Sequence, residues 1–299
     1  MKSYQRIFVF LLLVLLLTII ISPWAAFFSD SFMESRPSFS HIFGRLFMVL
    51  GAGLFFLCRP LLKIDSLSQL GLKPAGQWHC DFARGALIAL ASVIAVASLM
   101  SLLHVFTPFF RLSLSVALER SLKALLTALT VGVLEEIFFR GVIFKGLLED
   151  CKPPAAFACS SLFYAAIHFI KPAEEFSLAG IDPWAGARYL AGAFKPFLDP
   201  ALLPGLLGLF LIGMVLSYAF FRTGSLYLSM GLHAGWVFGI KTIRVYGDFR
   251  REDLGWIFGS SKPKLVSGVA VWIIILAVGL VIHWITRKRQ HLTSKVLSF

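Results

Sequence analysis

Residues 133–144, Val-Leu-Glu-Glu-Ile-Phe-Phe-Arg-Gly-Val-Ile-Phe (VLEEIFFRGVIF), place two acidic side chains and one basic side chain inside an otherwise apolar run. The run extends from about residue 122 to 147. That length suffices to cross a bilayer, since a spanning helix needs about 20 mostly apolar residues. Charged side chains at membrane depth are costly, and they mark functional sites by default. This stretch therefore points both to a membrane fold and to the place where its chemistry lies.

The composition of the whole chain fits a membrane protein. Of 299 residues, 58% are hydrophobic and 15% are charged, and the mean hydropathy is +0.82. Soluble domains are about 45–50% apolar and about 25% charged, so an ordinary soluble enzyme, a disordered chain and a small disulfide scaffold are excluded. The formal charge of +12 predicts contact with the headgroups of the lipid bilayer and no binding of nucleic acid, because basic residues flank membrane spans.

Eight apolar runs predict the fold. They cover about residues 7–28, 42–58, 85–106, 122–147, 155–170, 201–221, 225–240 and 265–286. The fifth and seventh runs are short for a span, so their helices either extend into flanking residues or pack inside the protein. No repeat or linker separates a second domain. We therefore expect an all-α, polytopic membrane helix bundle of about eight transmembrane helices, forming a single integral membrane domain over residues 1–299.

Helical geometry separates the two glutamates of the first stretch. Glu136 and Arg140 are four residues apart, so they lie on one helix face and can form an ion pair, which lowers the cost of burying both. Glu135 lies about 100° round the helix from Glu136 and about 140° from Arg140. Glu135 is therefore the carboxylate that the arginine neutralises less, and the better candidate for a general base.

Two histidines in later apolar runs add to this set. His168 follows Tyr164 by four residues, so the tyrosine can pack against or orient its imidazole. His233 lies between Gly231 and Gly235, which allow a neighbouring helix to approach closely. A carboxylate and two imidazoles that meet in a bundle can bind a metal, since two His and one Glu form a known catalytic zinc set. They can also activate water directly and stabilise an oxyanion.

Other interpretations of the same residues stay open at this point. A buried Glu–Arg pair on a membrane helix can be purely structural, and a histidine on an apolar face can be an ordinary core residue. A non-catalytic membrane protein can use the same cavity to bind a peptide or partner. A transporter can place such residues along an ion path, although the chain lacks the pair of broken helices in matching halves that is typical of transporters.

These motifs resemble those of the CAAX protease and bacteriocin-processing (CPBP, also ABI) family of intramembrane proteases, which includes the type II CAAX prenyl endopeptidases. The family pattern EExxxR is matched in full by Glu135, Glu136 and Arg140. The pattern FxxxH is matched with Tyr164 in place of Phe, ending at His168. The third motif begins at His233. The resemblance covers about residues 120–240, which would be the catalytic core.

The resemblance implies an intramembrane endopeptidase built from about eight helices around a water-accessible cavity. Glu135 and His168 would activate the attacking water, and His233 would help to stabilise the oxyanion. Glu136 and Arg140 would hold the site in shape. No cofactor is required, but the residues also fit zinc, with Glu135, His168 and His233 as its ligands. The substrate would be a membrane-associated peptide or protein, or a partner in bacteriocin self-protection for a non-catalytic relative. The expected location is a bacterial inner membrane.

The main departure from the family pattern is Val237, at a position where the family usually has Asn or another polar residue. The loss of one oxyanion-hole donor costs about 10²–10³ in rate in a serine protease. No Asn occurs anywhere in the chain, so another group, water or a backbone N–H would have to replace the amide. The indole of Trp236 is a donor, but it projects about 100° away from position 237 on the helix.

Overall fold

The computed structural model describes residues 1–32, 37–72, 76–110, 112–170, 182–250, 254–259 and 265–287. It divides the chain into two compact units. The first unit comprises Met1–Asp65 and Ala166–Leu202, and the second comprises Ser66–Ala165 and Leu203–Phe299.

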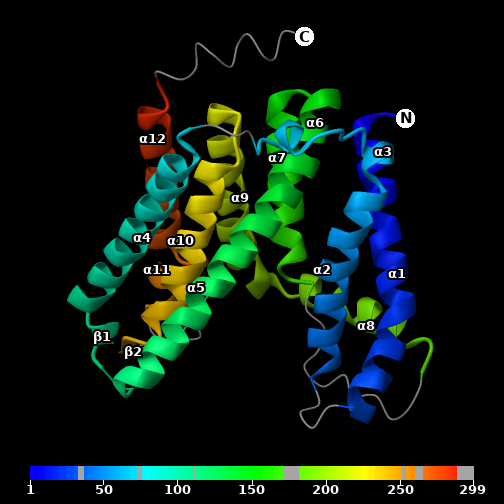
Figure 1. Ribbon diagram of the computed structural model, residues 1–299. Helices are drawn as coiled ribbons and strands as arrows, with labels where there is room; N and C mark the ends of the chain where they lie inside the picture. The colour runs from blue at the N-terminus through cyan, green and yellow to red at the C-terminus, as the bar shows by residue number, and fades with distance from the viewer. Residues whose placement is uncertain are drawn as a thin grey trace. The chain divides into compact units, whose positions relative to one another are not determined.

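The first unit is built around two long antiparallel neighbours, α1 and α2, which lie side by side in Figure 1. Its helices are α1 (Ser3–Phe32), α2 (Phe39–Leu57), α3 (Arg59–Leu62), α8 (Ala185–Ala193) and the 3-10 turns η3 (Lys195–Leu198) and η4 (Pro200–Leu202). Ser38 precedes α2 as its N-cap, and its side chain accepts a hydrogen bond from the backbone N–H of His41, as N-cap serines do. The ring of Tyr189 packs 4.6 Å from that of Phe43 and so joins α8 to α2.

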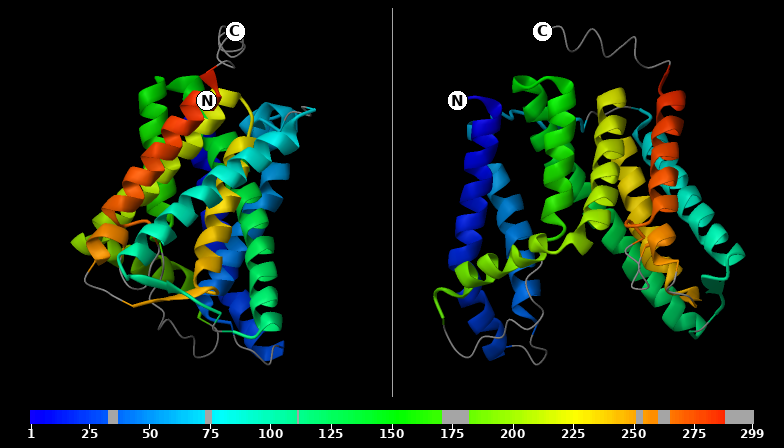
Figure 2. Two further views of the ribbon diagram at one scale, coloured as in Figure 1. Left: turned by 90° about the vertical axis from the view of Figure 1, so that its left-hand side faces the viewer. Right: turned by 180° about the vertical axis from the view of Figure 1, so that it is seen from behind.

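The second unit holds most of the remaining helices. These are η1 (Leu67–Leu70), α4 (Trp78–Leu102), α5 (Leu114–Glu136), the π-helix η2 (Ile137–Phe144), α6 (Lys145–Asp150), most of α7 (Pro153–Ile167), α9 (Leu203–Thr223), α10 (Tyr227–Ile243), α11 (Gly255–Phe258) and α12 (Val269–Ile285). Helices α9 and α12 run next to each other, as the right-hand view of Figure 2 shows. A cluster of buried side chains that includes Phe144, Phe220 and Met230 joins η2, α9 and α10.

Helix α10 is the central helix of this unit and packs on α4, α5 and α9. Glycines set its distance from α4. A Cβ atom on Gly231 would lie 2.0 Å from the backbone oxygen of Phe82, and one on Gly85 would lie 2.3 Å from that of Leu228. The two backbones thus touch directly, as small residues allow in membrane helices. The predicted close approach beside His233 is confirmed. Helix α10 corresponds to the seventh apolar run, one of the two that are short for a span, and most of its residues are buried.

A small β-pair was not expected from the sequence. Strand β1 (Phe106–Pro108) pairs antiparallel with β2 (Gly247–Phe249), with Phe106 opposite Phe249. The pair follows the C-terminal ends of α4 and α10 and so ties these two helices together a second time. Three residues per strand carry too little alternation to be recognised beside long apolar runs.

The chain is an all-α membrane protein. Among the described residues, four helical segments are long and apolar enough to cross a membrane: Ser3–Ser29, Phe39–Leu57, Trp78–Leu102 and Pro200–Thr223. Pro153–Ile167 and Val269–Ile285 are shorter apolar helices. Large apolar side chains such as Leu102, Phe110 and Leu280 are exposed, which suits a surface covered by lipid rather than water. Each of the eight predicted runs contains a helix, although only four pass this test for length and composition.

The close contact between α4 and α10 predicts that Gly231→Ala destabilises the protein. The added methyl group would collide with a backbone carbonyl, and overpacking of this kind costs about 1–3 kcal/mol. Thermal unfolding in detergent measures the effect. Gly53→Ala in α2 is the matched control, because nothing lies within 4 Å of a Cβ atom there. The control should be neutral or gain about 0.5–1 kcal/mol. Equal effects of the two substitutions would show that α4 and α10 do not pack this closely.

Candidate active site

One carboxylate oxygen, Oε1 of Glu136, organises the candidate site. Nη1 of Arg140 donates a hydrogen bond to it at 2.8 Å, and Nδ1 of His233 lies 2.9 Å from the same oxygen. The Glu136 side chain is 0% exposed and that of Arg140 is 1% exposed. The ion pair predicted from the four-residue spacing is therefore present. It is fully buried, and the imidazole of a histidine from a distant part of the chain contacts the same oxygen.

Besides its ion pair with Glu136, the guanidinium of Arg140 contacts two further helices, α9 and α7. Its Nη2 donates to the backbone oxygen of Gly213 in α9 at 3.2 Å. Its Cζ lies 4.6 Å from the centre of the Tyr164 ring in α7, within the range of a cation–π contact. The Tyr164 ring also lies edge-on to the imidazole of His233 in α10, with 6.1 Å between centroids. The Tyr164 ring therefore contacts both the guanidinium of Arg140 and the imidazole of His233.

Glu135 lies on the other side of the imidazole. Its Oε2 is 3.8 Å from Nε2 of His233, and its side chain is 29% exposed, in contrast to buried Glu136. The imidazole therefore faces a carboxylate at each of its two nitrogens, one at hydrogen-bond distance and one slightly farther away. Helical spacing predicted this difference between the two glutamates, because only Glu136 shares the face of Arg140.

The backbone changes its form at the site. Helix α5 ends at Glu136, and the next eight residues, Ile137–Phe144, form the π-helix η2. π-Helical turns are rare and occur frequently at functional sites. Arg140 lies inside this segment and Gly141 packs its backbone near Leu70, where a Cβ atom would meet the Leu70 oxygen at 3.2 Å. The π-helix was not predicted, since its sequence fits an ordinary α-helix equally well.

His168 lies immediately beyond the end of α7, one turn after Tyr164, and is half-buried. It belongs to the first unit, whereas Glu135, Glu136, Arg140, Tyr164 and His233 belong to the second. The structure thus brings five of the six predicted site residues together in one unit. The role of His168 stays a prediction from the sequence.

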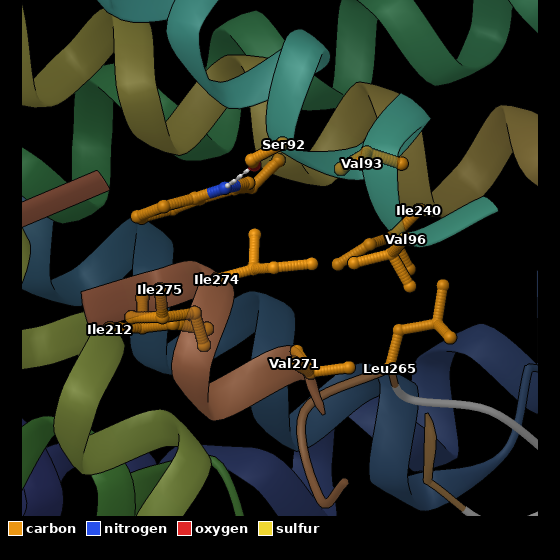
Figure 3. Close-up of a pocket in the computed structure, with 10 residues that line it drawn as sticks. Ser92, Val93, Val96, Ile212, Ile240, Leu265, Val271, Ile274 and Ile275 are labelled. Atoms are coloured by element: carbon orange, nitrogen blue, oxygen red, sulfur yellow. Dashed lines mark hydrogen bonds between the residues drawn. The ribbon is translucent and has the colours of Figure 1, made fainter. Parts of the chain in front are cut away.

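The indole N–H of Trp236 forms a hydrogen bond outside the candidate site. Its Nε1 donates to Oγ of Ser92 in α4 at 2.9 Å. Trp236 therefore does not supply the donor that a polar residue at position 237 provides in the family. This hydrogen bond forms one wall of a cavity of about 30 Å³. Figure 3 shows aliphatic side chains around it, including Val96, Ile240 and Ile275.

The part of the chain that the structure describes contains no group of three His, Cys, Asp or Glu side chains that could hold a metal ion. Only two of the three predicted zinc ligands, Glu135 and His233, are neighbours in one unit. A zinc site with His168 as third ligand stays a prediction.

A comparison with known families finds a match over the segment that contains these residues. Residues 117–239 match the family model described as Rce1-like, type II CAAX prenyl endopeptidase Rce1-like. This segment is similar to the Rce1-like family. The predicted resemblance to the CPBP family is thereby confirmed, and it points to a protease. The Rce1-like segment begins in α5, ends in α10 and includes every predicted site residue. No curated protein and no solved structure matches the chain significantly.

Arg140→Met should destabilise the protein strongly. It removes one partner of a buried pair, and such a loss costs about 3–5 kcal/mol because the remaining charge stays buried. Arg140→Met combined with Glu136→Leu should recover part of the loss, since the uncompensated charge is then removed. Unfolding by denaturant in mixed micelles measures all three proteins.

The exposed pair Glu119–Lys123 on α5 has the same four-residue spacing and provides the control. Lys123→Met should leave stability unchanged, because exposed pairs contribute little. A similar small effect for Arg140→Met would contradict a buried, structurally essential pair.

Proposed function

We propose that this protein is an intramembrane endopeptidase, CAAX-protease-like in its core, that hydrolyses a peptide bond of a membrane-associated peptide or protein. The observation that carries the proposal is the single imidazole of His233 between two carboxylates, 2.9 Å from Glu136 and 3.8 Å from Glu135. The similarity of residues 117–239 to the Rce1-like family supports it. The proposed setting is a bundle of about eight membrane helices in a bacterial inner membrane.

In the proposed mechanism, Glu135 is the general base. A water that hydrogen-bonds both Oε2 of Glu135 and Nε2 of His233 loses a proton to Glu135 as its oxygen attacks the substrate carbonyl. The C–N bond then breaks, and the proton passes to the leaving amine. The Glu135 side chain is 29% exposed although its Oε2 atom is buried, so the proposed water would enter along the exposed part of the side chain. His168 is assigned to the same water by the family resemblance.

His233 is proposed to stabilise the developing oxyanion. Glu136 accepts the proton of Nδ1, and such a carboxylate partner fixes the tautomer and orientation of an imidazole. Nε2 is then the nitrogen that faces the reacting atoms. The proton that Glu135 takes from the water passes to Nε2, which donates it in a hydrogen bond to the oxyanion before the leaving amine receives it. The neighbouring carboxylates balance the positive charge that the imidazole carries in this step.

Glu136, Arg140 and Tyr164 are positioning residues in this proposal. Glu136 orients the imidazole, and Arg140 neutralises Glu136, so that the second carboxylate does not compete with Glu135 for the proton. The ring of Tyr164 excludes solvent from the guanidinium. Because these residues act through His233, conservative changes in them should alter kcat more than KM.

No metal is required in this mechanism, and a zinc-dependent version with Glu135, His168 and His233 as ligands is the alternative. Zinc would lower the pKa of its bound water and polarise the substrate carbonyl. A chelator distinguishes the two versions. Cleavage that persists after prolonged treatment with chelator supports the glutamate-activated water, and cleavage restored only by added zinc supports the alternative.

Glu135→Gln should abolish cleavage while leaving the fold intact. The loss of a general base costs about 10²–10⁴ in rate, and the half-buried amide occupies the same space. The measurement is cleavage of a library of quenched fluorescent peptides, lipidated and unlipidated, by purified protein in micelles. Glu119→Gln, an exposed glutamate on the same helix, is the control and should cleave at the wild-type rate.

A Glu135→Gln variant that cleaves peptides at the wild-type rate would contradict the mechanism. No cleavage by folded wild-type protein, combined with peptide binding that survives Glu135→Gln, would favour the non-catalytic binding protein. Flux of ions or solutes through the protein in liposomes would favour the transporter.

Val237→Asn should raise the rate of cleavage. Position 237 lies one helical turn after His233, where the family usually has a polar residue, and a new donor to the oxyanion is worth up to about 10²–10³ in rate. Val237→Leu controls for the change in size. An unchanged or lower kcat in a folded Val237→Asn protein would show that the oxyanion is stabilised from elsewhere.

A further inference from the structure

Arg222, in the last turn of α9, is a further buried arginine that does not contact the candidate site residues. It is 3% exposed. Its Nε donates to Oγ1 of Thr286 at 3.0 Å, and Thr286 follows the last turn of α12 and is also buried. Thr286 in turn donates to the backbone oxygen of Ile282. Arg222 thus links the C-terminal ends of two neighbouring membrane helices.

Arg222 differs from Arg140 in the groups that surround its guanidinium. Among the described residues, no carboxylate pairs with Arg222, and its Nη2 is buried without a hydrogen-bond partner. The Tyr218 ring lies 5.9 Å from its Cζ, and the Tyr218 hydroxyl is 2.7 Å from Nδ1 of His283. An uncompensated buried cation is strongly unfavourable, so the geometry requires an anion that the described protein atoms do not supply.

Aromatic side chains place this end of the unit at a membrane surface. Trp284, two residues before Thr286, is 72% exposed. Tyr227 begins α10 only a few residues after α9 ends, and its ring lies 5.8 Å from that of exposed Trp78. Trp and Tyr concentrate at the level of the lipid headgroups. Figure 1 shows the C-terminal ends of α9 and α12 at the same end of the unit.

The sequence that follows α12 has one sign of charge. Residues 286–299, TRKRQHLTSKVLSF, contain four Lys or Arg and no Asp or Glu. Basic clusters next to a membrane helix attract anionic lipids. No acidic side chain of this segment is therefore available to neutralise Arg222, and anionic lipid is enriched where Arg222 lies.

We propose that Arg222, held in place by Thr286, forms a binding site for the phosphate of an anionic lipid headgroup. A guanidinium donates to phosphate oxygens in a planar, bidentate arrangement, and no described residue accepts a hydrogen bond from Nη2. The lipid supplies the missing negative charge and holds α9 against α12. The site does not depend on the proposed protease activity.

The experiment uses the full-length protein in a neutral detergent, with phosphatidylglycerol or inorganic phosphate added separately. Native mass spectrometry counts bound lipid, and thermal unfolding measures stabilisation. Phosphatidylglycerol should bind and raise the Tm of the wild type. Arg222→Gln should weaken this binding by about 10–100-fold, since hydrogen bonds to charged groups contribute about 1.5–3 kcal/mol. Arg120→Gln, which removes an exposed charge on α5, should bind as the wild type does.

Arg222→Lys provides a second variant, because it keeps the buried charge and removes the planar fork. It should bind more weakly than wild type and more tightly than Arg222→Gln. Equal binding by wild type and both Arg222 variants would overturn the proposal and leave Arg222 as a cap for the carbonyls of α9 and α12. Stabilisation by inorganic phosphate but not by the lipid would keep the phosphate site and overturn the lipid as its ligand.

Discussion

The sharing of one buried glutamate oxygen between an arginine and a histidine is the interaction on which the site depends. Oε1 of Glu136 receives Arg140 from its own helical run and His233 from α10. Because neither the carboxylate nor the guanidinium reaches solvent, each is tolerated only in the presence of the other. Arg140 extends the arrangement to α9 through the Gly213 carbonyl and to α7 through the Tyr164 ring. Four helical segments are thus held around a single charge.

The position of His233 depends on backbone packing as much as on this charge. Gly231 removes the side chain that would separate α10 from α4, and the turn that carries the imidazole follows directly. The Trp236–Ser92 hydrogen bond fixes the next turn of α10 against the same helix. The imidazole is therefore presented from a helix that cannot rotate without loss of close contacts, and it leaves Glu135 as the more accessible of the two carboxylates.

Sequence periodicity was enough to predict the helices, the Glu136–Arg140 pair and the separate position of Glu135, because helical spacing alone determines which side chains share a face. It could not predict that His233 contacts the same oxygen as Arg140, since that depends on tertiary packing. The π-helix has no distinct sequence signal, and the acceptor on Gly213 is a backbone oxygen that no side-chain pattern reports. In the sequence, Arg222 is one basic residue among many near the end of an apolar run, and its burial with no described carboxylate beside it is visible only in the structure.

The central claim is that Glu136 fixes the tautomer of His233 so that Nε2 faces Glu135. Nitrogen-15 NMR of the His233 imidazole in labelled protein tests this most directly. The account predicts a protonated Nδ1 whose resonance moves in Glu136→Gln and stays in place in Glu119→Gln. A neutral imidazole protonated at Nε2, with Nδ1 bare and insensitive to Glu136→Gln, would contradict the account.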